Sequence, residues 1–326
     1  MENTIDAQTE PLMVTIRCIT FNQASYIRDC LDGFVMQKTN FRFEAIVHDD
    51  ASTDGNADII KEYGEKYPDV IKPILETENQ WSKRDGSLGR IMDQNTHGKY
   101  VAWCEGDDYW IDPLKLQKQV DFLEAHPEYS MCWTDAFQES GETRTPYNRY
   151  TESCQSPMED IIEKGGGFIP TCSIMMRREV YEAMPKEAKG WYVGDYPLQM
   201  WAGWSGKVWY LKEQTCVYRF MAVGSWTASM DKYDTAEKFL KMYRNEKPMM
   251  DAFNKLTEYK YNDSFERYEA TVFYNHLLWA HDYPEARKYL KLRKMHGIHT
   301  GKAEAMLVQG HLHIAKLIGW LSSLKK

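Results

Sequence analysis

The sequence predicts an α/β protein built on a doubly wound, mostly parallel sheet, followed by a helical C-terminal region. Runs of β-branched and apolar residues alternate with amphipathic helical patterns over residues 12–125. From about residue 234 onward the patterns are helical, without strand signals. The 326 residues, 43% of them hydrophobic, are enough for one large α/β domain with an appendage, or for two domains.

The first two strands and helices follow from local composition. The run at 13–19 is rich in β-branched residues and predicts a strand. Asn22 follows it and is expected to cap a helix whose apolar positions keep helical spacing up to Val35. A second strand is expected at 43–47, and a second helix at about 55–67.

The next elements continue the alternation. Residues 70–75 form a third strand, and Pro73 predicts a place at the sheet edge because proline has no N–H to donate. A loop is expected at 76–90, with a helix at 88–96. The strand Lys99–Cys104 follows, and Pro113 starts another helix.

After residue 130 the pattern loosens. We expect strands at 131–137 and 168–176, a polar loop at 138–158 and a hairpin at 207–223. These predictions divide the chain into a sheet-containing domain and a helical region. Their expected bounds are 1–230, with halves of about 12–130 and 131–230, and 231–326.

Charge and composition limit location and partners. The net charge is −8, but residues 284–326 carry +7 and the rest −15, so we expect no nucleic-acid partner. The polar N-terminus and the lack of an 18-residue apolar run predict a cytoplasmic protein. Apolar positions of the last helix, 303–326, predict docking on the catalytic domain, homodimer contact or peripheral contact with the inner face of a membrane. Seven cysteines without CxxC pairs indicate reduced thiols.

A threonine and several acidic residues lie where the predicted strands end. Thr20, Asp50, Asp107 and Asp108 each follow a predicted strand, and ligands of such sheets bind at the carboxyl ends of the strands. The chain has neither GxGxxG after its first strand nor GxxxxGK[ST], the usual phosphate-binding loops. Carboxylates can hold a phosphate only through a cation, so the cluster predicts Mn²⁺ or Mg²⁺ and a diphosphate ligand.

Several motifs in a fixed order carry a family resemblance. They read ITFNQASYI, FEAIVHDDASTDG, GKYVAWCEGDDYWIDPLKL and HPEYSM. In this order the sequence resembles family 2 glycosyltransferases of the GT-A fold over about residues 12–225. The segment CEGDDYW is similar to the corresponding segment of bacterial cell-surface polysaccharide transferases. The resemblance implies a metal-dependent, inverting glycosyltransferase that moves a sugar from a nucleotide-diphosphate donor, a UDP-sugar, to a glycan or lipid-linked acceptor.

The resemblance also assigns roles to single residues. Thr20 matches the residue that lines the nucleoside pocket, and Asp50 matches the Asp that hydrogen-bonds the uracil base. Asp107 matches the acid near the ribose, and Asp108 the acid that binds the metal. Glu105 takes the first acid position of the DxD-like pattern, at the ribose or the metal.

Two further roles come from the second half. Asp195, in the segment WYVGDYP, matches the general base that deprotonates the acceptor hydroxyl. The family often has Tyr-Arg-x-His at the diphosphate site. Here the segment ends in Met221, which cannot bind phosphate, so the expected contribution to nucleotide binding falls to Arg219.

Two other functions remain open at this point. A nucleotidyltransferase would use similar acids, but it normally has a glycine-rich, basic loop after the first strand, where this chain reads TFNQAS. A non-catalytic nucleotide-sugar-binding protein would keep the same site and lack turnover.

Overall fold

The computed structural model describes residues 11–185, 194–230 and 233–310. The chain forms two compact units, which are described separately. The sheet-containing unit comprises 1–158, 166–190 and 195–229, and the helical unit comprises 159–165, 191–194 and 230–326. The apolar face predicted for the last helix falls mostly on residues 311–326, which lie outside the described residues.

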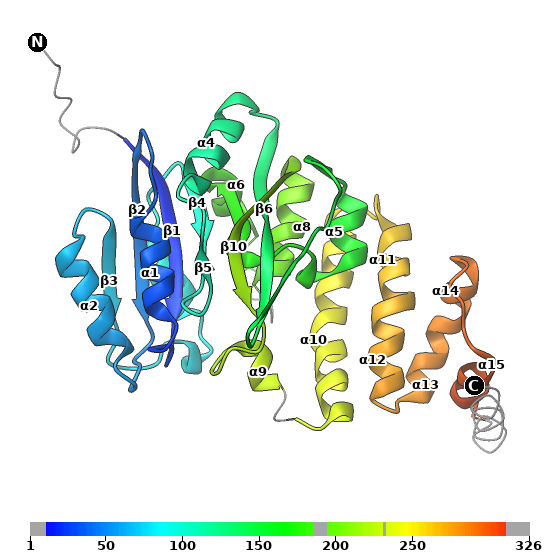
Figure 1. The fold of residues 1–326 in the computed structure, drawn as a ribbon. Coiled ribbons are helices and arrows are strands. Elements are labelled where there is room, and N and C mark those ends of the chain that lie inside the picture. The colour runs from blue at the N-terminus through cyan, green and yellow to red at the C-terminus, as the bar shows by residue number, and fades with distance from the viewer. Residues whose placement is uncertain (1–10, 186–193, 231–232, 311–326) are drawn as a thin grey trace, which may run out of the picture. The chain divides into compact units, whose positions relative to one another are not determined.

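The first unit is built on one ten-stranded sheet with the order β3-β2-β1-β4-β9-β6-β10-β5 (Figure 1). In addition, β7 pairs with β6 and β8 pairs with β10. The strands are β1 (Leu12–Thr20), β2 (Arg42–Asp49), β3 (Ile71–Leu75), β4 (Tyr100–Trp103), β5 (Tyr109–Trp110), β6 (Tyr129–Ser140), β7 (Thr143–Pro146), β8 (Cys154–Ser156), β9 (Ile174–Arg177) and β10 (Lys207–Arg219).

The helices of this unit connect the strands. They are α1 (Ile27–Val35), α2 (Asn56–Lys66), α3 (Ser87–Gln94), α4 (Lys115–Ala125), α6 (Arg178–Glu182) and α8 (Asp195–Ser205), and α5 (Met158–Lys164) and α9 (Trp226–Met230) begin here. Apolar faces of α1 and α4 pack on the sheet in one core, where the rings of Phe34 and Trp110 lie 5.0 Å apart.

The parallel sheet predicted from strand–helix alternation is found in the first half, where β3, β2, β1 and β4 are all parallel. The second half is mixed, because β9 runs antiparallel to both β4 and β6. The edge position predicted for Pro73 is confirmed, since β3 ends the sheet. The overall α/β class is therefore as the sequence predicts, with antiparallel strands added beyond β4.

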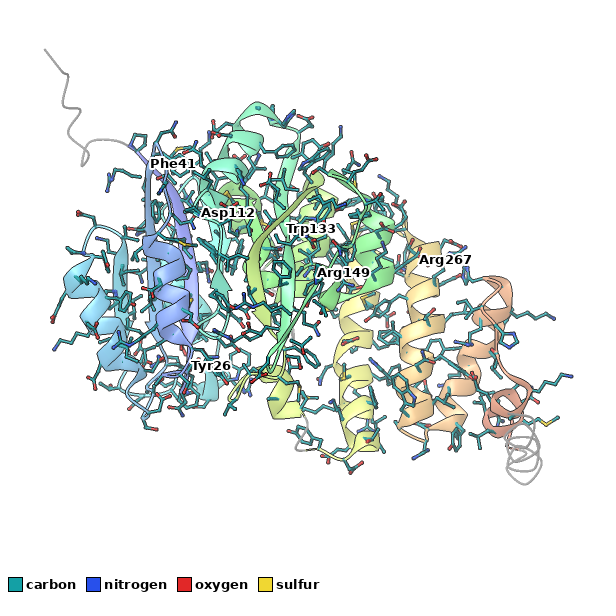
Figure 2. All side chains as sticks on the ribbon, viewed as in Figure 1. Tyr26, Phe41, Asp112, Trp133, Arg149 and Arg267 are labelled. Atoms are coloured by element: carbon teal, nitrogen blue, oxygen red, sulfur yellow. The ribbon has the colours of Figure 1, made fainter. Side chains whose placement is uncertain are left out.

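The register brings the carboxyl ends of the parallel strands to one edge. Thr20 at the end of β1 lies opposite Asp49 at the end of β2, and Arg17 lies opposite Trp103 at the end of β4. Figure 2 labels Tyr26 at this edge, with Phe41 at the opposite one. Residues that follow β1, β2 and β4 are consequently close in space although far apart in sequence.

Four local predictions are wrong. Asn22 does not cap α1, because its side-chain oxygen accepts the backbone N–H of Thr53 instead. The expected loop at 138–158 contains the end of β6, all of β7 and β8. The expected hairpin at 207–223 is the single long strand β10, and the strand expected at 168–176 is confined to β9, after two short 3-10 turns.

The helical region predicted from about residue 234 onward is confirmed, since the described residues from 235 form helices and no strand. Its helices are α10 (Thr235–Leu256), α11 (Asn262–Tyr268), α12 (Tyr274–Trp279), α13 (Tyr283–Ala286), α14 (Leu290–Met295) and α15 (Lys302–Val308). Asp234 caps α10 by accepting the backbone N–H of Glu237 at 3.1 Å. Within the described residues, no helix has both the length and the apolar character that crossing a membrane requires.

Two glycines give a matched test of the packing around β1. A Cβ at Gly98 would lie 2.4 Å from the backbone nitrogen of Thr15, whereas a Cβ at Gly89, within α3, meets nothing within 4 Å. We expect Gly98→Ala to lower the free energy of unfolding by about 1–3 kcal/mol through overpacking. Gly89→Ala should raise it by up to about 1 kcal/mol through helix propensity. Urea unfolding followed by circular dichroism measures both, and equal effects would contradict the packing described here.

Candidate active site

The acid motif, defined as residues 105–108 (EGDD), is attached to β1 by backbone hydrogen bonds. The N–H of Cys104 donates to the carbonyl of Arg17 at 3.2 Å, and the N–H of Gly106 donates to the carbonyl of Ile19 at 3.1 Å. The N–H of Asp108 then donates to the carbonyl of Glu105, which closes a turn. Three acids are thereby fixed at the carboxyl edge of the sheet by main-chain bonds that do not depend on their own side chains.

Gly106 lets this turn lie directly on the end of β1. A Cβ at this position would be 2.5 Å from Oγ1 of Thr20 and 2.7 Å from Oε1 of Gln23, and real Cβ atoms do not approach other atoms so closely. Any other residue here would push the acid motif away from Thr20. The second residue of the EGDD motif is therefore a steric requirement.

Gln23 is a site residue that sequence reasoning missed. It is buried, and a hydrogen bond from its side chain acts against the rise in the pKa of Asp107. Its Oε1 accepts no hydrogen bond from the described residues. The only sequence signal was its position, three residues after the end of β1.

Burial, together with neighbouring like charges, determines the electrostatics of the motif. Burial among protein atoms, followed by the charges of Asp107 and Asp195, raises the pKa of Glu105 to about 8. The carboxyl group of Glu105 lies among protein atoms, although the residue as a whole is exposed to solvent. The effect of Asp195 on this pKa shows that residues 90 positions apart share one electrostatic neighbourhood.

Asp107 and Asp108 are shifted in the same direction. Burial raises the pKa of Asp107, and it raises the pKa of Asp108 well above its usual range, with a further contribution from the charge of Asp107. The backbone N–H of Arg219 donates to Oδ1 of Asp108 at 2.9 Å and partly opposes that rise. The acids are therefore held together at a cost that a bound cation would relieve.

Arg219 binds the acid motif from β10. Its Nη1 donates to the carbonyl of Asp107 at 3.0 Å, its Nε donates to Glu139 at 3.1 Å, and its Nη2 pairs with Asp29. The guanidinium lies 4.3 Å from the ring centroid of Tyr109. The predicted nucleotide-binding arginine thus already has protein partners, and sequence reasoning missed the two acids, Asp29 and Glu139, that hold it.

Asp195 is the first residue of α8. Its Oδ1 accepts the backbone N–H of Tyr196 at 2.7 Å, and its Oδ2 accepts the hydroxyl of Thr171 at 3.4 Å. Burial raises its pKa, against the effect of these two hydrogen bonds. The structure therefore brings the predicted base into the neighbourhood of Glu105 and holds its carboxylate in a fixed orientation.

Thr20 and Asp50 lie at the neighbouring strand ends. The backbone N–H of Asp50 donates to the carbonyl of Thr20 at 3.0 Å, which joins the ends of β1 and β2. Asp50 is 2% exposed, and its Oδ1 and Oδ2 accept the backbone N–H groups of Gln80 at 2.6 Å and Trp81 at 3.0 Å. The residue predicted to contact the base is bound to the loop that follows β3.

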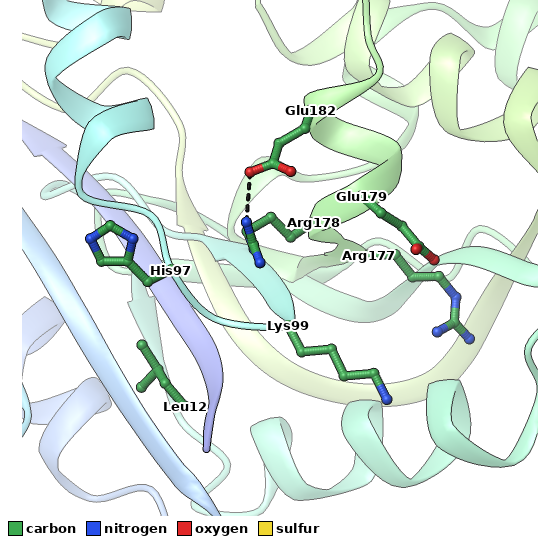
Figure 3. Close-up of a pocket in the computed structure, with 7 residues that line it drawn as sticks. All are labelled: Leu12, His97, Lys99, Arg177, Arg178, Glu179 and Glu182. Atoms are coloured by element: carbon green, nitrogen blue, oxygen red, sulfur yellow. Dashed lines mark hydrogen bonds and ion pairs between the residues drawn. The ribbon is translucent and has the colours of Figure 1, made fainter.

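A separate pocket of about 270 Å³ lies at the opposite, amino-terminal edge of the sheet (Figure 3). Its cations are already engaged: Lys99 pairs with Glu124, Arg178 pairs with Glu182, and Arg177 donates to backbone carbonyls. This pocket contains none of the predicted site residues. Among the described residues, no group of three or more His, Cys, Asp or Glu side chains is arranged to hold a metal ion by itself.

Two bacterial proteins are similar to this chain in sequence. An uncharacterised protein of Mycobacterium tuberculosis is 35% identical over 233 residues, which cover 69% of this chain and 63% of that protein. The chain thus spans less than two thirds of the length of this relative. The putative teichuronic acid biosynthesis glycosyltransferase TuaG of Bacillus subtilis is 29% identical over 170 residues, covering 51% of this chain and 63% of TuaG.

Solved structures show the same fold. S. aureus TarS 1–349 in complex with UDP-GlcNAc matches with a TM-score of 0.60 and 17% identity, over 94% of this chain and 88% of that one. The mannosyltransferase PcManGT from Pyrobaculum calidifontis, in complex with GDP-Man and Mn²⁺, matches with a TM-score of 0.52 and 18% identity, over 93% and 80% of the two chains. The sequence profile described as "Glycosyl transferase family 2" matches residues 15–184, more than half of the chain, and the chain belongs to this family.

Proposed function

We propose that this protein is a metal-dependent, inverting glycosyltransferase that uses a nucleotide-diphosphate sugar, with UDP-sugars as the first candidates. One observation carries the proposal. Glu105, Asp107, Asp108 and Asp195 share one electrostatic neighbourhood, and burial raises the pKa of each. Glu105, Asp107 and Asp108 would suit the binding of a cation with a diphosphate. Asp195 would suit the role of general base.

The donor would lie along the carboxyl edge of β2, β1 and β4. Thr20 and Asp50 belong to its nucleoside end, and Asp107 and Glu105 to its ribose and diphosphate end. The complex of TarS with UDP-GlcNAc supports a UDP-sugar as donor, and the complex of PcManGT with GDP-Man makes a GDP-sugar the second candidate to test.

The acid motif fits a divalent cation. Its donor atoms are carboxylate oxygens, the ligands that Mn²⁺ and Mg²⁺ prefer, and burial together with like charges raises the pKa values of Glu105 and Asp108, a penalty that a cation would offset. We assign Asp108 as the ligand, with Glu105 at the metal or the ribose. The cation would neutralise the charge of the leaving diphosphate. The Mn²⁺ in the PcManGT complex supports this assignment.

Asp195 would act as the general base. A carboxylate whose pKa burial has raised is a stronger base near neutral pH than an exposed one. The bonds from Tyr196 and Thr171 would orient it while it takes the proton of the acceptor hydroxyl. Attack by that hydroxyl from the face opposite the diphosphate inverts the anomeric carbon.

Arg219 would serve the nucleotide site by positioning. Its guanidinium holds the carbonyl of Asp107 and its backbone N–H holds the carboxylate of Asp108. A direct phosphate contact would compete with Asp29 and Glu139 for the same guanidinium.

We further propose a glycan or lipid-linked acceptor from bacterial surface polysaccharide synthesis. The name of TuaG, which refers to teichuronic acid biosynthesis, supports this class. Residues 1–230 would form the catalytic domain, with the acceptor half at about 131–230. The helical region 231–326 would contact a membrane surface or a second copy of the chain.

Substituting the proposed base and metal ligand should separate chemistry from binding. Asp195→Asn should lower kcat by about 10²-fold or more with donor binding retained, because the amide cannot accept a proton. Asp108→Ala should abolish transfer and weaken Mn²⁺-dependent donor binding. Turnover kinetics with calorimetric donor binding measure both, and wild-type turnover in Asp195→Asn would remove that residue as the base.

The function itself is tested by a thermal-shift screen of nucleotide sugars with Mn²⁺, followed by a donor-hydrolysis assay on each that binds. A bound ligand at 100 times its Kd adds about 2.7 kcal/mol to the free energy of unfolding, so binders are readily seen. Binding with turnover is the expected result. Binding of a nucleotide sugar without any turnover would favour a non-catalytic binding protein.

The raised pKa of Glu105 predicts a pH-dependent stability. The folded chain keeps the Glu105 proton up to about pH 8, far above the usual value of 4.5, so the free energy of unfolding falls as pH rises through this interval. Glu105→Gln removes the charge and should therefore raise Tm at pH 8.5 by a few degrees, with little change at pH 5.

Mn²⁺ should stabilise the wild-type chain more at pH 8.5 than at pH 5, because at low pH protons compete for the same carboxylates. Differential scanning fluorimetry measures the shifts for Glu105→Gln and for Mn²⁺. A pH-independent gain in either case would contradict the electrostatic explanation.

A further inference from the structure

Arg149, labelled in Figure 2, is an exposed cation on the segment that follows β7. Its Nε donates to the carbonyl of Phe168 at 3.1 Å, and its Nη2 donates to the carbonyl of Gly167 at 2.7 Å. Its guanidinium lies 4.5 Å from the ring centroid of Tyr147. Two carbonyls and a ring therefore fix the direction of this side chain, while no acid of the described residues forms an ion pair with it.

The backbone before Arg149 is fixed as well. Asn148 has a positive φ of 46°, a conformation that Asn adopts more readily than most residues. Its N–H donates to both carboxylate oxygens of the buried Asp135, at 3.2 and 3.3 Å. The N–H of Tyr147 donates to the carbonyl of Ala136 at 2.9 Å. These bonds attach the segment to β6, so Arg149 has a defined place relative to the sheet.

The turn that Arg149 holds lies against the proposed base. A Cβ at Gly166 would be 3.9 Å from Oδ1 of Asp195. The side chain of Gln199, on α8, donates to the carbonyl of Gly166 at 3.1 Å. The turn Gly166–Phe168 is thus bound both by Arg149 and by α8, the helix that begins with Asp195.

Tyr147 connects Arg149 with the acid motif. Its ring centroid lies 6.5 Å from that of Tyr218, the residue before Arg219. Burial is the main cause that raises the pKa of Tyr147, and among the smaller contributions the charge of Arg149 lowers it and that of Asp108 raises it. Arg149 consequently belongs to the same neighbourhood as the proposed metal ligand, within the half of the domain that we assign to the acceptor.

Arg149 differs from arginines that only connect parts of the chain. Arg177, Arg219 and Arg293 each donate from Nε, Nη1 and Nη2 to protein acceptors. In the part of the chain that the structure describes, Nη1 of Arg149 has no acceptor. The bond from its Nη2 is exposed, so the outer edge of the guanidinium is open to solvent. The fork formed by Nη1 and Nη2 matches two oxygens of a carboxylate or a phosphate.

We propose that Arg149 binds a negatively charged group of the acceptor, a carboxylate or a phosphate, close to the hydroxyl that reacts. The inference rests on the proposed glycosyltransferase function and deepens it by naming the charge of the acceptor. The turn Gly166–Phe168 would hold the bound oxyanion at a fixed place relative to Asp195. Arg149 takes no part in proton transfer, because its guanidinium stays protonated.

Binding of simple sugars to the full chain tests this assignment. The chain is first saturated with UDP and Mg²⁺, or with GDP and Mg²⁺ should UDP not bind. Three probes then share one ring and differ in charge: glucose, glucuronate and glucose 6-phosphate. Titrations followed by saturation-transfer NMR should show at least one anionic probe binding about tenfold more tightly than glucose. The stronger of the two anions distinguishes a carboxylate from a phosphate as the natural group.

Substitutions locate the preference. Arg149→Gln should raise the Kd of the anionic probe to about that of glucose, because an amide can still donate to a carbonyl but has no charge. Arg149→Lys should retain part of the preference, since it keeps the charge and loses the fork. Arg177→Gln is the matched control: Arg177 also donates to backbone carbonyls, but it lines the pocket at the opposite edge of the sheet (Figure 3).

The ratio of the Kd values for charged and neutral sugars separates recognition from a structural role, since loss of a loop contact alone does not discriminate by charge. Should Arg149→Gln fail to fold, the wild type gives the same test through salt. Its preference should shrink between about 50 and about 500 mM NaCl, because salt screens an exposed charge pair.

Equal binding of glucose and both anions by the wild type, or no binding of any probe, overturns the assignment. A preference that Arg149→Gln retains, that Arg177→Gln also loses, or that salt leaves unchanged overturns it too, and Arg149 is then a structural contact of its loop. These results leave the proposed function standing if the nucleotide binds. A chain that binds neither UDP nor GDP overturns the proposed function itself, and the Arg149 inference with it.

Discussion

Burial of several carboxylates at one edge of the sheet is the constraint on which the rest of the site depends. Glu105, Asp107 and Asp108 lie within the four positions 105–108 in a protein-dense region, where burial raises the pKa of each and the charge of Asp107 raises those of Glu105 and Asp108 further. Main-chain bonds to β1 and the clamp of Arg219 hold them there. Gly106 makes the close approach to Thr20 sterically feasible. The protein supplies the framework, and the proposed cation would balance the charge that this framework leaves.

The parts of the fold that the sequence predicts well are those with regular alternation. Strands β1, β2, β3 and β4 are apolar runs separated by amphipathic helices, and a parallel sheet is the arrangement that buries both. The long strand β10 was mistaken for a hairpin because the polar residues at 212–214 interrupt its apolar pattern, where its register against β6 shifts. Strand β7 was missed because all of its residues are exposed, so it has no buried face to mark it.

The site shows the same limit. The acids could be predicted because each follows a strand, and carboxyl ends of parallel strands share an edge. Asp29 and Glu139 could not, because their contact with Arg219 joins three segments separated by more than 70 residues each. For Asp50, the motif indicated the place but not the partners, since only the folded loop shows that its carboxylate binds backbone N–H groups.

The position of Pro73 also affects how the molecule behaves in a crowded solution. An edge strand normally offers a row of unpaired N–H and C=O groups that a strand from another molecule can extend. Strand β3 has five residues with a proline at its centre, so its row of N–H donors is interrupted. At the other end of the main strand order, β5 has only two residues. The two ends of the main strand order are therefore poor templates for the addition of a strand from another molecule. This protects the sheet-containing unit against aggregation through these strands.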